Sequence, residues 1–280
     1  MAMADSGRAP ALRLALAAVP ATVSWISFTP VKGLRVRELQ EAELTADGIP
    51  GDRAFFLVDP VGTLVNGKRL GPLVTVVADH DAATGRLALL FPDGREVAAD
   101  VELGEPVDVR FHRIALRTRA VGGPFSEALS EHVGVPLRLV AAPPERPGVD
   151  RGRDGAVTLL SRASLERLRQ ESGGDGEVDP RRFRMTFGID GVVAHEEDGW
   201  RGRELRIGAA LLRVTGNVGR CVVTTRDADT GVVDFPTLHH LQAYRGDDAI
   251  ETTEPLPFGV HARVLEPGRV RVGDAVTPSA

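Results

Sequence analysis

The sequence predicts a mainly β fold with a few helices, of the α+β class. Through the first 120 residues, short runs of β-branched and aromatic residues alternate with turns that contain glycine or proline. Convincing helical apolar periods come only later, in three separate segments. Closely spaced strands with few helices favour a barrel or a sandwich.

Taken in order, the first half should consist of strands and one clear hairpin. The expected strands are residues 22–28, 35–44, 53–59, 63–67 and 73–79. Residues 86–91 and 95–103 should pair around Asp93-Gly94, because Asp-Gly suits the primed turn of a β-hairpin.

The second half mixes helices with strands. A helix is expected over 123–134, with Phe125, Leu129 and Val133 on one face. Another should follow Ser161 as its N-cap and bury Leu165 and Leu168. Residues 143–155 should form a linker or a site loop. Strands are expected over 182–190, 203–207 and 210–216, followed by a third helix over 236–245 and a hairpin through Pro267-Gly268.

Composition narrows the class of protein. The chain has 280 residues, 42% hydrophobic and 26% charged, which is ordinary for a globular protein. A net charge of -5 disfavours a nucleic-acid partner. The single cysteine excludes an internal disulfide, and we expect a cytoplasmic protein. Residues 1–21 should be an extension and not a targeting peptide, because Arg13 interrupts the apolar run 9–21; no stretch is long enough for a membrane span.

Several familiar motifs are approached but not completed. Residues 62–68 (GTLVNGK) nearly spell a phosphate-binding loop, but Arg69 stands where Ser or Thr must hold magnesium. Residues 227–231 (DADTG) lack the spacing and the glutamate of a calcium loop, so a tight turn explains them better. No nucleophile elbow and no paired cysteines or closely spaced histidines support a hydrolase or a zinc enzyme.

Cys221 is the candidate functional residue. A lone cysteine is usually a small buried hydrophobic residue. Here Arg220 precedes it, and a neighbouring guanidinium favours the thiolate that binds metals. Gly216, Asn217 and Gly219 suggest an open turn before it. Neither detail identifies a metal.

Residues 220–231 (RCVVTTRDADTG) closely resemble the signature of MOSC domains, the C-terminal module of molybdenum cofactor sulfurases, and of the amidoxime-reducing component family. Other segments resemble the family in the same order along the chain, from about residue 22 to residue 276. They are 29–33 (TPVKG), 51–59 (GDRAFFLVD), 182–184 (RFR), 243–245 (AYR) and the closing stretch 258–274.

The resemblance implies a MOSC N-terminal β-barrel domain over 22–120 and a β-barrel MOSC domain over 121–280. It also implies a molybdenum–molybdopterin cofactor with Cys221 as metal ligand and catalytic residue; a soft thiolate suits molybdenum. The cofactor carries a phosphate, so its pocket should hold cations. By resemblance, the cofactor-binding residues are Lys32, Gly33, Arg53, Asp154, Gly155, Arg184, Arg220 and Cys221.

The chain departs from the family at three places. Met185-Thr186 replaces a common Pro-Asn, Gly219 stands where a serine is frequent, and residues 66–69 (NGKR) replace a common arginine-containing stretch. These changes leave the metal ligand intact and bear on substrate identity and pocket shape. No aminotransferase-like sulfurase domain is present, so no pyridoxal phosphate chemistry is implied.

The leading hypothesis is therefore a molybdenum-dependent oxidoreductase that reduces N-hydroxylated or related N–O or S–O compounds. Its substrate would be a small molecule. The electrons for the reduction would come from a separate flavin or iron–sulfur protein, because the chain shows neither a dinucleotide fingerprint nor clustered cysteines. Two alternatives stay open: a non-catalytic carrier of the cofactor, and a sulfur-transfer protein that bears a persulfide on Cys221.

Overall fold

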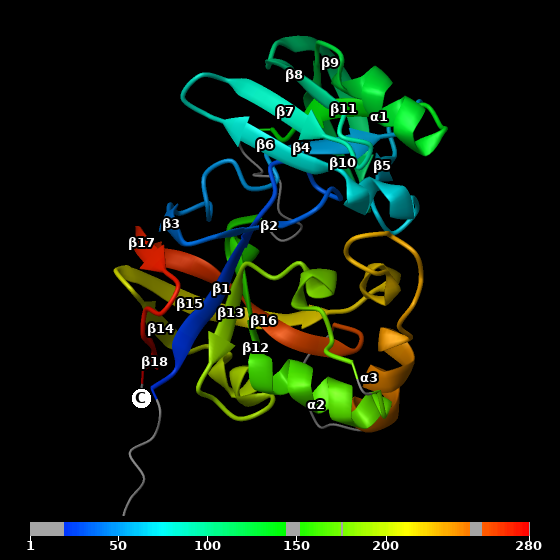
Figure 1. Ribbon diagram of the computed structural model, residues 1–280. Coiled ribbons are helices and arrows are strands. Elements are labelled where there is room, and N and C mark those ends of the chain that lie inside the picture. Colours follow the sequence, from blue (N-terminus) through cyan, green and yellow to red (C-terminus); the bar gives the residue numbers. More distant parts are fainter. Residues whose placement is uncertain (1–19, 144–151, 175, 247–253, 280) are drawn as a thin grey trace, which may run out of the picture.

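The computed structural model describes residues 20–143, 152–174, 176–246 and 254–279, and the mainly β, α+β class is confirmed. Figure 1 shows two stacked bodies. We call the one at the bottom of the view the large body and the one at the top the small body. Among the described residues, no helix is long and apolar enough to cross a lipid bilayer.

An eight-stranded sheet forms the large body. Its order is β18 (Val276–Pro278), β14 (Glu204–Ile207), β15 (Ala210–Gly219), β16 (Pro257–Glu266), β12 (Val157–Ser161), β13 (Phe187–Asp190), β1 (Thr22–Phe28) and β2 (Arg37–Leu39). All pairs are antiparallel except β12 with β13. The sheet is barrel-like because a bridge between Thr22 and Ala275 draws β1 towards the start of β18, although the paired ladder stays open there.

Two helices cover the lower part of the large body, α2 (Arg162–Ser172) and α3 (Thr237–Arg245). Both match the sequence prediction. Ser161 caps α2, its Oγ accepting from the Ser164 amide at 3.0 Å, and Leu165 and Leu168 are buried as expected. The large body also contains the 3-10 helices η2 (Gly152–Gly155), η3 (Pro180–Phe183), η4 (Glu196–Trp200) and η5 (Val222–Thr225).

The small body has its own core and its own sheets. The five-stranded sheet has the order β5 (Leu64–Val65), β4 (Phe55–Val58), β11 (Arg138–Ala141), β10 (Ile114–Val121) and β9 (Leu103–Phe111). A three-stranded sheet of β6 (Val77–Asp81), β7 (Arg86–Leu90) and β8 (Glu96–Asp100), the 3-10 helix η1 (Gly71–Thr75) and helix α1 (Phe125–Val133) complete it. The β7–β8 hairpin and α1, with Phe125 and Leu129 buried, were predicted.

The chain passes between the bodies more than once. β1, β2 and β3 (Glu41–Leu44) belong to the large body, where β3 pairs with β17 (Gly268–Arg271). Two crossing segments, 29–34 and 49–55, therefore lie between the two hydrophobic cores. They are hydrogen-bonded to each other: the Arg53 amide donates to the Thr29 carbonyl at 2.7 Å and the Lys32 amide to the Phe55 carbonyl at 2.8 Å.

Five local predictions were wrong in part. The open turn expected at Gly216, Asn217 and Gly219 is instead the last part of β15. The strand expected over 35–44 breaks at Gln40 into β2 and β3, which pair with different strands. Residues 71–75 form η1 because Pro72 starts a helical turn before β6. Residues 180–183 form η3 instead of a strand, and the strand begins at Phe187. β17 does not fold back on β16 through Pro267-Gly268 but pairs with β3.

The expected division into 22–120 and 121–280 stays a prediction about domains. In the described hydrogen bonding, β1–β3 join the large body, while α1 and β11 pack into the core of the small body.

Candidate functional site

A cavity of about 270 Å³ lies where the crossing segments meet the large body. Among the described residues, its wall contains five lysine and arginine residues and no aspartate or glutamate. The lining residues are Lys32, Gly33, Arg53, Asn66, Gly67, Lys68, His112, Gly155, Ala156, Thr158, Phe183, Arg184, Met185, Thr186, Val218, Gly219, Arg220, Cys221, Val223 and Thr224. The described wall is therefore cationic in a chain whose net charge is -5.

Cys221 lies on this wall and is exposed. β15 ends at Gly219, and Cys221 is the N-cap of η5, whose first turn is held by the Thr224 amide donating to the Cys221 carbonyl at 3.1 Å. Gly219 has no room for a side chain: a Cβ there would stand 2.9 Å from the Pro255 carbonyl oxygen. The glycine that departs from the family pattern is thus required by this backbone. The thiol is not part of the apolar core.

The Arg220 guanidinium is directed to backbone carbonyls, whereas its position next to Cys221 in the sequence suggested a role beside the thiol. Its side chain is buried, and its Nε donates to the Phe258 carbonyl at 2.8 Å while Nη1 donates to the Phe183 carbonyl at 3.2 Å. The guanidinium also lies against the rings of both phenylalanines. Arg220 therefore ties β15 and β16 to the end of η3 from within the cavity wall.

The crossing segments bring Lys32, Gly33 and Arg53 to the cavity. Lys32 is 8% exposed, and its Nζ lies 5.5 Å from the centre of the Phe111 ring. Gly33 has φ +96° and packs so closely that a Cβ would stand 3.0 Å from Asn66 Cα, which explains the glycine. Arg53 pairs with the neighbouring Asp52.

Arg184 reaches the cavity from the large body. It is the C-cap of η3, in the left-handed conformation with φ 56°. Its Nη2 donates to the Leu34 carbonyl at 2.7 Å, and its own carbonyl accepts from Arg53 Nη2 at 2.9 Å. Arg53, φ 51°, is also left-handed. The two arginines thus join the bodies reciprocally at the cavity.

Of the residues predicted by resemblance, Asp154 is the one that does not line the cavity. Its carboxylate pairs with Arg263 at 2.9 Å, and both side chains are exposed. The adjacent Gly155 does line the cavity, at the end of η2. The structure therefore brings Lys32, Gly33, Arg53, Gly155, Arg184, Arg220 and Cys221 together and leaves the Asp154 side chain outside.

Sequence reasoning missed Lys68 and His112. Lys68 belongs to residues 66–69, which were noted as a departure from the family and as a failed phosphate-binding loop, but not as part of the site. His112 is exposed in the turn between β9 and β10, with φ 57°. Lys68 carried a local signal, since it follows Asn-Gly after a strand; His112 carried none.

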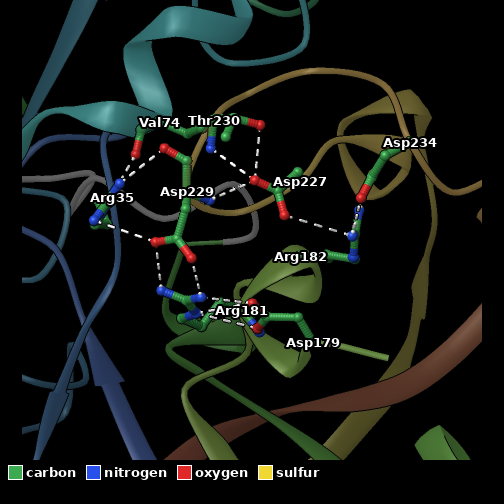
Figure 2. A network of polar contacts seen from close by, with 9 residues as sticks. All are labelled: Arg35, Val74, Asp179, Arg181, Arg182, Asp227, Asp229, Thr230 and Asp234. Atoms are coloured by element: carbon green, nitrogen blue, oxygen red, sulfur yellow. Dashed lines mark hydrogen bonds and ion pairs between the residues drawn. The ribbon is translucent and has the colours of Figure 1, made fainter. Parts of the chain in front are cut away.

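The loop that follows η5 contains aspartates that form ion pairs with arginines of other segments (Figure 2). Asp229 pairs with Arg181 of η3 at 2.6 Å and with Arg35 at 3.2 Å, and Arg35 follows the first crossing. The hydrogen bond from Arg181 holds the pKa of Asp229 below its ordinary value. Asp227 Oδ1 accepts from the Thr230 amide at 2.7 Å and closes the tight turn expected there. The loop after Cys221 is thus fastened to both sides of the site.

Comparison with known proteins finds two domain families that match the chain. The MOSC N-terminal β-barrel domain matches residues 20–136, and the MOSC domain matches residues 143–277. Among curated proteins, mitochondrial amidoxime reducing component 2 of Macaca fascicularis is 39% identical over 285 residues, covering 91% of this chain and 82% of the relative. Mitochondrial amidoxime-reducing component 1 of Xenopus laevis is 28% identical over 284 residues, covering 91% and 81%.

Among solved structures, the YUAD protein from Bacillus subtilis aligns over 92% of this chain and 94% of its own, with a TM-score of 0.42 and 11% identity. The two domain matches are in order along the chain and the sequence relatives span most of it. The chain belongs to the family of MOSC domain proteins that also carry the MOSC N-terminal β-barrel domain, together with the amidoxime-reducing components.

Proposed function

We propose that the cavity binds a molybdenum–pterin cofactor and that the protein is an oxidoreductase reducing N-hydroxylated or related N–O or S–O compounds. The observation that carries the proposal is an exposed thiol, Cys221, on the wall of a cavity whose described lining includes five cationic side chains and no carboxylate. The names of the relatives, amidoxime-reducing components, support reduction of such substrates.

The donor set fits this cofactor. A thiolate is a soft ligand of the kind that molybdenum accepts beside the two dithiolene sulfurs of molybdopterin. Lys32 and Arg184 supply a point charge and a planar fork for the phosphate; Lys32 reaches the cavity from the first crossing segment and Arg184 from the large body. A cavity of about 270 Å³ lies close to the lower end of the range for ligand sites.

Each residue of this chain then has a physical task. Cys221 binds the metal and, with Lys32 and Arg184, orients the cofactor. Arg53 and Arg220 hold the wall through their bonds to backbone carbonyls: Arg53 joins the second crossing segment to the large body, and Arg220 ties β15 and β16 to the end of η3. When bound, the cofactor supplies two-electron transfer and acceptance of the substrate oxygen. A separate flavin or iron–sulfur protein would deliver the electrons, and we keep the cytoplasmic location as a prediction.

The test is metal and pterin analysis of protein purified from a host that makes the cofactor, combined with reduction of an aromatic amidoxime by an artificial electron donor. We expect one molybdenum and one pterin per chain, and loss of turnover in Cys221→Ala. Cys221→Ser should retain pterin with an altered optical spectrum, because a hydroxyl is a harder ligand than a thiolate.

Other outcomes would replace the proposal. Tight pterin binding without any reductase turnover would indicate a carrier. Sulfane sulfur on Cys221 in metal-free protein would indicate sulfur transfer. Turnover in Cys221→Ala equal to that of the unchanged protein would contradict the assignment of the thiol.

A further inference from the structure

The cavity wall contains two cationic or imidazole side chains that the phosphate anchor does not require. Three of the other cationic side chains are mostly buried, namely Lys32, Arg53 and Arg220. Arg53 pairs with Asp52, and Arg220 donates to backbone carbonyls. Lys68 and His112 differ, because both are exposed and both come from the small body. They form the outer part of the wall.

Strand pairing brings Lys68 and His112 to the same end of the small body. Thr63, the residue before β5, forms a parallel bridge with Arg110 of β9. The two strands therefore run side by side in one direction, and each ends within a few residues at the cavity: β5 before Asn66, and β9 before His112. The two residues thus reach the same cavity from neighbouring strands although 44 positions separate them in the sequence.

The backbone around Lys68 is held close to the cysteine. Gly67 packs against η5: a Cβ on Gly67 would stand 3.7 Å from Val223 Cγ2, two residues after Cys221. The Lys68 amide donates to Asn66 Oδ1 at 3.0 Å, and its carbonyl accepts from Arg226 Nη2 at 3.4 Å. In the part of the chain that the structure describes, the Lys68 ammonium has no ion-pair partner. Its place is therefore fixed while its charge is left for a ligand.

We propose that Lys68 and His112 form an outer subsite for an anionic group, a carboxylate or phosphate, on the molecule bound in the cavity. The proposal rests on the function proposed above and deepens it. A wall whose described residues include cations and no carboxylate concentrates anions, and an exposed lysine together with an imidazole on the same wall can donate to an anionic oxygen. The group is either a carboxylate of the substrate or a second phosphate on a nucleotide-bearing pterin.

The test compares Lys68→Gln with Arg69→Gln. Arg69 is the next residue, is exposed and pairs with Asp59 at 3.2 Å, but does not line the cavity. The substrates are benzamidoxime and its para-carboxylate. We expect the ratio of kcat/KM, carboxylate over neutral, to fall about two- to fivefold in Lys68→Gln, as for one exposed charge pair. Lys68→Arg should restore the ratio, and Arg69→Gln should leave it as in the unchanged protein.

His112 is tested by His112→Asn, because asparagine tolerates the left-handed backbone that this turn requires. Combined with Lys68→Gln it should lower the ratio further. Raising the salt concentration should shrink the difference between the unchanged protein and Lys68→Gln, since exposed charges are screened.

Analysis of pterin and released nucleotide separates the two sources of the anion. A lower kcat/KM ratio with unchanged pterin content assigns the subsite to the substrate. Loss of pterin from Lys68→Gln, with a nucleotide released from the unchanged protein on denaturation, assigns it to the cofactor. If Lys68→Gln matches Arg69→Gln in both the ratio and the pterin content, the subsite is refuted.

A binding measurement keeps this test apart from the reductase proposal. If the unchanged protein reduces neither amidoxime, titration of 4-fluorobenzoate followed by fluorine NMR still reads the subsite. Weaker binding in Lys68→Gln than in Arg69→Gln supports it even though the proposed reaction has failed. Equal binding in the two variants overturns it.

Discussion

Two arginines at the cavity, Arg53 and Arg184, have backbone conformations that side chains rarely adopt. Their φ values of 51° and 56° place both in the left-handed region, at a cost that surrounding contacts must offset. The reciprocal bonds of Arg53 to the Arg184 carbonyl and of Arg184 to the Leu34 carbonyl provide those contacts. A histidine of the cavity wall, His112, shares this conformation. Three of the five described non-glycine residues with positive φ therefore line the cavity; the other two are His195 and Leu256.

Replacing Arg184 by alanine should mainly weaken retention of the cofactor. The change removes a charge-assisted contact worth about 1.5–3 kcal/mol, or about ten- to hundredfold in affinity. Pterin content after extensive dialysis measures the loss of cofactor, and Arg184→Lys should retain more pterin than Arg184→Ala. The control is Arg206→Gln, which removes a surface pair with Glu266 on the large body. Equal retention in Arg184→Ala and Arg206→Gln would contradict the anchor.

Glu197 should make stability depend on pH. Its side chain is fully buried in η4; Oε1 accepts from Ser164 Oγ at 2.8 Å, and Oε2 has no partner among the described residues. Burial raises the pKa of Glu197 above its ordinary 4.5, and the adjacent Asp198 raises it further. The folded protein therefore keeps a proton that the unfolded chain releases, so this contribution to stability is full below pH 4.5 and is lost as pH rises.

Glu197→Gln removes this titration. The free energy of unfolding of the variant, minus that of the unchanged protein, should rise with pH above 4.5 and level off once the buried carboxyl ionises. Denaturant unfolding from pH 4 to pH 8 measures the difference. Glu196→Gln is the matched control because its side chain is exposed. A difference that stays flat over this range would show that Glu197 does not keep its proton.

Cys221 and most cationic residues of the site could be identified from the sequence, but their roles could not. The pattern around Cys221 and the ordered matches to the family lead to Lys32, Arg53 and Arg184. The sequence could not show that the Arg220 guanidinium turns to the Phe258 carbonyl, because that carbonyl is 38 residues away. Nor could it join His112 to the site, since a lone histidine in a turn has no local pattern.

At the scale of elements, predictions succeeded where the signal is local. The helix after Ser161, the β7–β8 hairpin and α3 are set by a cap, a turn and an apolar period within a few residues. Prediction failed for β17, whose partner β3 lies more than 220 residues earlier, and for η3, where Pro180 starts a turn among strand-like residues. Pairing over such distances depends on the whole chain path.

The N-cap of α2 offers a test of one element. Ser161→Ala removes the acceptor of the Ser164 amide inside a fully buried cap, and should lower the free energy of unfolding by about 0.5–2 kcal/mol. Ser172→Ala, at the other end of α2, is the control, because its half-buried hydroxyl donates to the Arg169 carbonyl and accepts from the Gly174 amide only at the long distance of 3.4 Å. Urea unfolding measures both. A loss no larger in Ser161→Ala than in Ser172→Ala would show that the cap does not stabilise the helix.

Across the whole molecule, the site follows from the chain path. Segments 29–34 and 49–55 cross between the bodies and carry Lys32, Gly33 and Arg53, while the large body contributes Cys221 and Arg184. A site at such crossings needs both bodies in place, and the loop of Asp229, fastened to Arg35 and Arg181, supports the same junction (Figure 2). The sequence shows the two domain matches in order along the chain. It cannot show that β1, β2 and β3, which lie within the first match, pack in the large body with strands of the second match.

The chain path predicts that residues 143–280 will not fold alone, although they contain the MOSC match. Without β1, strand β13 loses its antiparallel partner, and the core loses Trp25, Ile26 and Phe28, each contributing about 1.5–3 kcal/mol when buried. An exposed apolar strand edge also promotes aggregation. We expect this fragment to lack a cooperative unfolding transition in circular dichroism.

The control for this fragment is a protein in which residues 20–53 are joined to residues 143–280 through a short glycine–serine linker. The small body can be removed in this way because it begins and ends at one place: the Ala142 amide donates to the Ala54 carbonyl at 2.7 Å. With β1, β2 and β3 restored, the large body should unfold cooperatively, yet bind less pterin because the part of the cavity wall that the small body supplies is gone. Cooperative unfolding of the 143–280 fragment with the same midpoint as the linked protein would show that β1 is dispensable, because the large body would then draw its stability from the later strands alone.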